Sequence, residues 1–169
     1  MKIIKISSEN LVECHRINQE NTPEVGSVTL EELQNSLDNS DYNLCAVVDN
    51  EVVGFVICFQ DTETTNSYMG DIDHKNFSEI SQRISDFLYI DRIAVDKNYR
   101  KKSIGSKLYD EVVNFAEMNS ISYLTAEINL LPSKNTPSFR FHEKFDFTEL
   151  DTVKYSEDYE VSLQVRINS

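Results

Sequence analysis

Residues 87–106 read Phe-Leu-Tyr-Ile-Asp-Arg-Ile-Ala-Val-Asp-Lys-Asn-Tyr-Arg-Lys-Lys-Ser-Ile-Gly-Ser, which is an apolar run followed by a basic turn. The apolar run, residues 87–95, is typical of a β-strand. Beyond the turn, apolar residues recur at intervals of three and four, which predicts an amphipathic helix of about four turns. These residues are Ile104, Leu108, Val112 and Phe115. A strand that leads through a short turn into a helix indicates an α/β fold.

The flanking sequence adds further strands and helices, and together they predict one domain over residues 1–169. Strand-like runs occupy residues 2–6, 43–48, 51–59, 122–128, 147–150, 153–155 and 159–167. Helices are predicted over residues 10–19, from a capping box at Thr29 onward, and over 137–144 with Thr136 as the N-cap. Residues 60–82 are polar with little periodicity, so we expect a long surface loop there.

Composition excludes several classes of protein. The 169 residues include 16 basic and 29 acidic ones, for a net charge of −13. This charge repels phosphate backbones and anionic lipids, so we expect no nucleic-acid or membrane partner. No apolar run approaches the roughly 20 residues that cross a bilayer, and residues 1–6 do not resemble a signal peptide. Three widely spaced cysteines without a CxxC pair predict no disulfide framework and no metal site. We therefore expect a cytoplasmic protein.

The basic turn is a candidate anion site. Four of the sixteen basic residues lie within six positions, at Lys97, Arg100, Lys101 and Lys102. The first turn of the following helix exposes unpaired N–H groups, and small residues let an anion approach them. These features favour phosphate or pyrophosphate. A solvated basic turn is the alternative, because the segment is neither a Walker loop nor a Rossmann fingerprint. A further alternative is an unrelated protein that uses the basic turn to bind nucleotide phosphates.

A second motif narrows these alternatives. Residues Ile93-Ala94-Val95, then Arg100 to Gly105, are followed about thirty residues later by Asn135, Ser138 and His142-Glu143-Lys144-Phe145-Asp146-Phe147. In this order the two motifs resemble the GNAT-type N-acetyltransferase superfamily over residues 87–150. The resemblance implies a mixed, mostly antiparallel sheet of six to seven strands. About four helices would flank this sheet, and two central strands would splay apart. Ser103 and Asp146 stand where the family has glycine, and His142 stands where it commonly has tyrosine.

The resemblance implies acetyl-CoA as the acyl donor. Its pyrophosphate would lie on the basic turn, and its pantetheine arm would pair with the backbone of the preceding strand. Asn135 matches the residue that hydrogen-bonds this arm. The implied cofactor-binding residues are Ile93, Ala94, Val95, Arg100, Lys101, Lys102, Ser103, Ile104, Gly105, Ser106, Asn135, Ser138 and Phe141.

Transfer to an amine also needs proton chemistry. His142 matches the position of the general acid that protonates the leaving thiolate, although a histidine between phenylalanines is also typical of a core. Glu127 and Asp91 are candidate bases, and Tyr89 shares a strand face with Asp91. Each of these acids could equally be a surface group. The cysteines lie in apolar patterns, so we expect direct transfer in a ternary complex rather than a ping-pong route.

The acceptor would be a primary amine, either on a small molecule or on an exposed amino group. A non-catalytic acyl-CoA-binding module on the same fold is the alternative, which the three substitutions keep open. Members of this family often pair, so a homodimer is an expectation by analogy only.

Overall fold

Seven strands form one sheet in the computed structural model, which describes all of residues 1–169. The strand order is β1-β2-β3-β4-β5-β7-β6, and the pairs β1–β2, β2–β3, β5–β7 and β6–β7 are antiparallel. The strands are β1 Lys2–Ile4, β2 Tyr42–Val48, β3 Glu51–Gln60, β4 Phe87–Val95, β5 Tyr123–Leu131, β6 Thr148–Ser156 and β7 Tyr159–Ile167. This architecture confirms the predicted mixed, mostly antiparallel sheet.

Six α-helices and two short 3-10 helices connect the strands. The α-helices are α1 Leu11–Glu20, α2 Leu30–Asn39, α3 Glu63–Asp71, α4 Lys75–Ser81, α5 Ile104–Met118 and α6 Thr136–Glu143. The 3-10 helices are η1 Ser8–Asn10 and η2 Lys97–Tyr99. None of these helices is both long and apolar enough to cross a bilayer.

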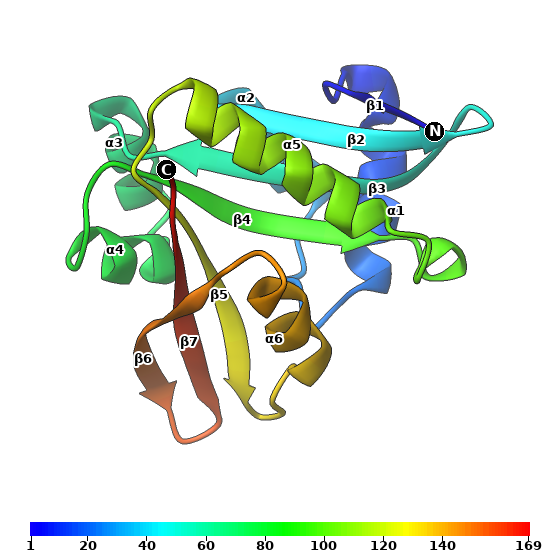
Figure 1. Ribbon diagram of the computed structural model, residues 1–169. Coiled ribbons are helices and arrows are strands. Elements are labelled where there is room, and N and C mark those ends of the chain that lie inside the picture. The colour runs from blue at the N-terminus through cyan, green and yellow to red at the C-terminus, as the bar shows by residue number, and fades with distance from the viewer. The chain divides into compact units, whose positions relative to one another are not determined.

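Residues 1–59 and 90–115 form one compact unit, the first unit. In Figure 1, α5 runs across one face of its strands and α1 lies behind them. Tyr42 of β2 stacks on Phe115 of α5 with ring centroids 4.0 Å apart. The apolar stripe of α5 is buried, as its pattern predicts, and the core also draws on α1, α2 and the strands. Fully buried core residues include Cys14, Ile17, Leu33, Cys45, Phe55, Leu108 and Val112.

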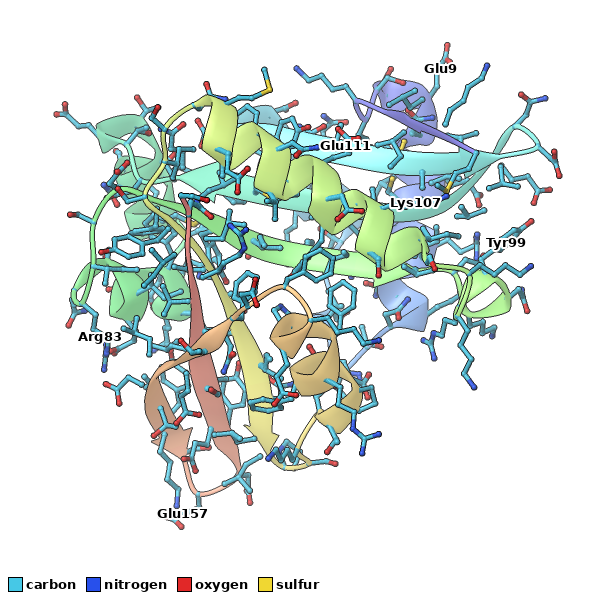
Figure 2. The ribbon with its side chains drawn as sticks, in the orientation of Figure 1. Glu9, Arg83, Tyr99, Lys107, Glu111 and Glu157 are labelled. Atoms are coloured by element: carbon cyan, nitrogen blue, oxygen red, sulfur yellow. The ribbon has the colours of Figure 1, made fainter.

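Residues 60–89 and 116–169 form the second unit. Here the start of β4 pairs in parallel with β5, Phe87–Tyr89 against Tyr123–Thr125. Helix α4 is fixed to β6, because the Tyr155 hydroxyl donates to Asn76 Oδ1 at 2.6 Å. Arg83, labelled in Figure 2, pairs with Asp151 at 2.8 Å. The predicted single domain and the predicted splay toward Val95 and Ile128 stay predictions.

Residues 60–82 differ from the expected loop, because they form α3 and α4. The side chain of Thr62 accepts a hydrogen bond from the Thr65 N–H, and His74 Nδ1 accepts one from the Phe77 N–H, so each helix has an N-cap. Only a few apolar residues anchor them, including Met69 and Phe77. Helices of nine and seven residues with so few anchors give no readable period.

Two further boundaries differ from the sequence expectations. The two strands predicted over residues 147–155 are one strand, β6, with register shifts at Glu149/Asp151 and Lys154/Ser156. The N-cap of α6 is Asn135 rather than Thr136. A β-bulge interrupts the alternation along a strand, and this makes one strand read as two.

Candidate functional site

The basic turn of the first unit exposes its charges and bends sharply. Arg100, Lys101, Lys102 and Ser103 are all exposed. Lys101 and Ser103 have φ values of 64° and 62°, the left-handed region that glycine adopts most easily. Lys102 Nζ lies 4.7 Å from the centroid of the Tyr99 ring, and Figure 2 shows Tyr99 at this turn, before Lys107 of α5. The turn therefore leads into α5, and its lysine and arginine side chains face solvent.

Ile104 is buried behind this turn, whereas Gly105 and Ser106 are half-buried in the first turn of α5. The first intrahelical bond runs from the Lys107 N–H to the Ser103 carbonyl at 3.0 Å. The N–H groups that precede it in the first turn are those that a helix leaves without intrahelical partners. This is the geometry of an anion site with cationic side chains around it.

A side chain of α1 fixes the start of the turn. Asp96 Oδ2 accepts from Arg16 at 2.9 Å, and Asp96 Oδ1 accepts from the Asn98 N–H at 2.8 Å. Burial raises the pKa of Asp96, but the Asn98 N–H and Arg16 outweigh it and leave this pKa below its usual value. The carboxylate is therefore a charged anchor for the turn.

Asn21, just after α1, is a site residue that the sequence did not indicate. Its Nδ2 donates to the carbonyls of Ile17 at 2.8 Å and Val95 at 3.2 Å. Its Oδ1 accepts from Arg100 at 3.0 Å. One amide thus joins the end of α1, the end of β4 and the basic turn. An asparagine at the end of a helix is too common to mark such a contact in sequence.

The end of β4 is tightly packed on β3. A Cβ built on Gly54 would lie 3.1 Å from the Ala94 carbonyl oxygen and 3.0 Å from Ile104 Cγ2. Glycine at this position allows β4 and the start of α5 to approach the β3 backbone. Ala94 is buried, and its neighbours Ile93 and Val95 are half-buried.

In the second unit, the α6 motif is held by its own hydrogen bonds. Asn135 Oδ1 accepts from the Ser138 N–H at 3.3 Å and caps the helix. His142 Nδ1 lies 2.8 Å from the Ser138 carbonyl, so this nitrogen carries the proton and donates it. The His142 ring also meets Phe141 and Phe147 edge-on, at 5.6 and 5.0 Å between centroids.

The environment of His142 opposes the predicted role of general acid. The residue is only 4% exposed, and burial lowers the pKa of its imidazole to about 4 although the Ser138 carbonyl acts in the opposite sense. The ring is therefore neutral near pH 7, with its Nδ1 proton held by a backbone carbonyl. A neutral ring in this state is a poor proton donor, so the geometry favours a role in positioning α6.

Tyr89 and Glu127 are brought together. The Tyr89 hydroxyl donates to Glu127 Oε2 at 2.6 Å, and the tyrosine is fully buried whereas the glutamate is partly exposed. The buried phenol orients a carboxylate that keeps contact with solvent. This is a reasonable arrangement for a general base that acts on an incoming amine.

Asp91 belongs to the first unit and faces a cation. Its Oδ2 lies 3.1 Å from Arg92 Nε, and its side chain is 7% exposed. Arg92 also donates to Asn18 Oδ1 at 2.8 Å and to the Gly26 carbonyl at 3.0 Å. A carboxylate held in a buried ion pair is a weaker candidate base than Glu127.

Ser103 and Asp146, which stand where glycine was expected from the motifs, both have a backbone conformation that glycine adopts most easily. Ser103 and Asp146 have φ values of 62° and 61°. The chain therefore keeps the left-handed conformation at both places despite the side chain, at a cost of roughly 1–2 kcal/mol each.

Both the sequence and the fold are similar to those of known proteins. A sequence model described as "Acetyltransferase (GNAT) family" matches residues 11–147. No curated protein matches the chain. Among solved structures, Ard1 from Thermoplasma volcanium has a TM-score of 0.78 at 18% identity, over 99% of this chain and 97% of its own. The ribosomal-protein-alanine N-acetyltransferase from Brucella melitensis has a TM-score of 0.73 at 20% identity, over 99% of each chain. NAA60 from Arabidopsis thaliana, in complex with a bisubstrate analogue, has a TM-score of 0.72 at 17% identity, over 99% and 98%.

Proposed function

Because the chain belongs to the GNAT acetyltransferase family and is an acetyltransferase, we propose that it moves an acetyl group from acetyl-CoA to a primary amine by direct transfer in a ternary complex. The family and the fold support acetyl transfer in general terms. The contact between Tyr89 and Glu127 supports the finer statement, since it orients a carboxylate toward proton abstraction.

The first unit has residues that suit the pyrophosphate of acetyl-CoA. Exposed Arg100, Lys101 and Lys102 supply positive charge, and the first turn of α5 supplies backbone N–H groups. A dianion fits this set of donors, whereas the rest of the chain is strongly acidic. Acetyl-CoA, when bound, supplies the acetyl group as a thioester.

Ile93, Ala94 and Val95 are proposed to face the pantetheine arm through their backbone, and Asn135, Ser138 and Phe141 through α6. Asn135 Oδ1 already caps α6, so its Nδ2 is the group that we assign to the arm. His142 then keeps α6 in place through the Ser138 carbonyl rather than donating a proton.

Glu127 is the proposed general base in the second unit. A primary amine is protonated near neutral pH, and it must lose a proton before its nitrogen can attack a carbonyl carbon. Glu127 would accept this proton, directly or through one water, while Tyr89 holds the carboxylate in a single orientation. Asp91 is proposed to hold Arg92 instead.

The burial of the cysteines supports direct transfer. Cys14, Cys45 and Cys58 are all fully buried. The neighbouring Cys45 thiol and burial raise the pKa of Cys14, and burial raises that of Cys58. A hydrogen bond with Cys14 lowers the pKa of Cys45, although burial acts in the opposite sense. All three thiols are closed off from solvent, and a thiol without access to the thioester is a poor nucleophile, so no acetyl-cysteine step is proposed.

The experiment is an assay of thiol release from acetyl-CoA with a panel of primary amines. Glu127→Gln is expected to lower kcat by about a hundredfold or more, the range of general base catalysis. Glu157→Gln is the matched control, because Glu157 is an exposed surface acid of the same unit. The proposal would be contradicted if none of the amines in the panel gave thiol release. Full activity of the Glu127 variant would also contradict it.

A further inference from the structure

Helices α3 and α4 line a cavity in the second unit that is open to solvent, with a volume of about 270 Å³. The lining residues are Asn66, Met69, Gly70, Asp73, His74, Phe77, Ser78 and Ser81. Met69 and Phe77 are buried and fix the floor, whereas Asp73 and the serines are exposed at the rim. A cavity of this size holds a small organic group and no more.

This cavity lies next to the proposed general base. The rings of His74 and Phe77 meet the Tyr89 ring at 5.4 and 5.7 Å between centroids. The Tyr89 hydroxyl in turn reaches Glu127. Two residues that line the cavity therefore contact the tyrosine that orients the proposed base.

A second contact joins α4 to β6. The Tyr155 hydroxyl donates to Asn76 of α4 at 2.6 Å. The pKa of Tyr155 is raised mainly by burial. The charges of Glu79, Tyr159 and Glu127 raise it further, with the contribution of Glu79 the largest of the three. Asn76 immediately precedes Phe77 of the cavity wall. The link from the cavity to Glu127 therefore runs through Tyr89, which contacts the cavity wall with its ring and Glu127 with its hydroxyl.

The cavity favours a cation. Asp73 is the one acidic residue in the cavity lining, and no lysine or arginine lines it. The Asp73 carboxylate takes part in no salt bridge, although it stands at the cavity rim. Hydroxyl and amide oxygens of Ser78, Ser81 and Asn66 can accept hydrogen bonds from an ammonium group. An ammonium ion in this cavity would meet a carboxylate and several further acceptors.

We propose that the α3–α4 cavity binds a second cationic group of the acceptor, so that the preferred acceptors are small diamines. One amino group would lie at Glu127 and lose its proton, and the other would stay charged and lie against Asp73. The inference rests on the proposed amine acetylation, because it names the acceptor class for that reaction.

Two variants test the cavity without disturbing the fold. Asp73 has a φ of 51°, which asparagine tolerates well, so Asp73→Asn removes the charge and keeps the backbone. Gly70 of α3 lines the cavity, and a Cβ there would meet nothing within 4 Å, so Gly70→Leu adds bulk to the cavity wall with a residue that favours helix. Asp71→Asn is the control, since Asp71 is an exposed acid of α3 that does not line the cavity.

The readout is kcat/KM for straight-chain α,ω-diamines and for monoamines of the same chain length, together with the Kd of coenzyme A. Asp73→Asn is expected to lower kcat/KM for diamines about fivefold, the loss of one partly exposed ion pair, and to leave monoamines unchanged. Gly70→Leu is expected to lower diamine turnover further. Asp71→Asn and the Kd of coenzyme A should not change.

The outcomes separate the two proposals. No thiol release with any amine contradicts the proposed function itself. Release with monoamines and diamines at equal kcat/KM, or a diamine preference that survives both variants, overturns the cavity assignment and leaves amine acetylation standing. A thermal unfolding curve for each variant confirms that a loss of turnover is not a loss of fold.

Discussion

The guanidinium of Arg100 donates a hydrogen bond of 3.0 Å to Oδ1 of Asn21, whose Nδ2 donates to the carbonyl of Val95. This amide orients an exposed cation beside the first turn of α5. The cation and the strand end are therefore positioned by the same residue. If the turn holds pyrophosphate, changes at both residues must affect binding of coenzyme A, and by different amounts.

The first prediction concerns Arg100→Glu. It replaces a cation with an anion at the proposed phosphate site, so the Kd of coenzyme A should rise by roughly a hundredfold or more. Asn21→Ala should raise it by less, because the arginine stays but loses its orientation. Isothermal titration calorimetry measures both. Lys97→Glu is the charge-matched control in the same turn. An equal rise in the Kd for this variant would indicate general charge attraction rather than a specific phosphate site.

The second prediction concerns the two left-handed residues that replace glycine. Ser103→Gly and Asp146→Gly should each stabilise the fold by about 0.5–1 kcal/mol, because relief of left-handed strain exceeds the added entropy of the unfolded chain. Ser103→Gly should also tighten coenzyme A binding, since it removes a Cβ from the turn. Asp146→Gly should leave binding unchanged. Urea unfolding gives the free energy of unfolding, and calorimetry gives the Kd of coenzyme A. An equal change in Kd for both variants would contradict the assignment of the Ser103 turn to the phosphate site.

The third prediction concerns Gly54. Gly54→Ala should lower the free energy of unfolding by about 1–3 kcal/mol, because its Cβ would crowd the Ala94 carbonyl and Ile104. The same shift should weaken coenzyme A binding, since both neighbours belong to the proposed site. Gly70→Ala is the opposite case: its Cβ meets open space in a helix, and it should stabilise the protein. A Gly54 variant as stable as the wild type would show that β4 can move freely.

Much of this fold was predictable because its signals are local. The stripe from Ile104 to Phe115 and the apolar run of β4 follow from periodicity alone. Tyr89 and Glu127 could be named as candidates one by one, but their contact joins residues 38 positions apart and needs the β4–β5 register. The sequence left His142 open between a general acid and a core histidine, because a motif does not record the burial that lowers its pKa.

The parts that were missed have equally physical reasons. Helices α3 and α4 bury few residues, so the polar composition of residues 60–82 hides them. Asn21 makes two contacts with distant parts of the first unit, at Val95 and Arg100, and no spacing in the sequence records such contacts.

The last prediction concerns His142 and pH. Its pKa is about 4 in the folded protein and near 6.5 in an unfolded chain, so the unfolded state binds more protons between these values. Its contribution to stability is therefore complete above pH 6.5 and is lost as the pH falls toward 4, by about 3 kcal/mol. His142→Asn keeps a donor for the Ser138 carbonyl and does not titrate. The difference in unfolding free energy between wild type and variant should shrink by that amount from pH 7 to pH 4.

The same variant separates positioning from acid catalysis. If His142 only positions α6, His142→Asn should retain most of kcat at pH 7, whereas His142→Ala should lose the contact with Ser138 and weaken coenzyme A binding. If His142 were the general acid, both variants would lose kcat equally and the pH profile of kcat would lose its alkaline limb. Because the folded imidazole is neutral at pH 7 and its Nδ1 proton is already bound to a carbonyl, we expect rescue by asparagine.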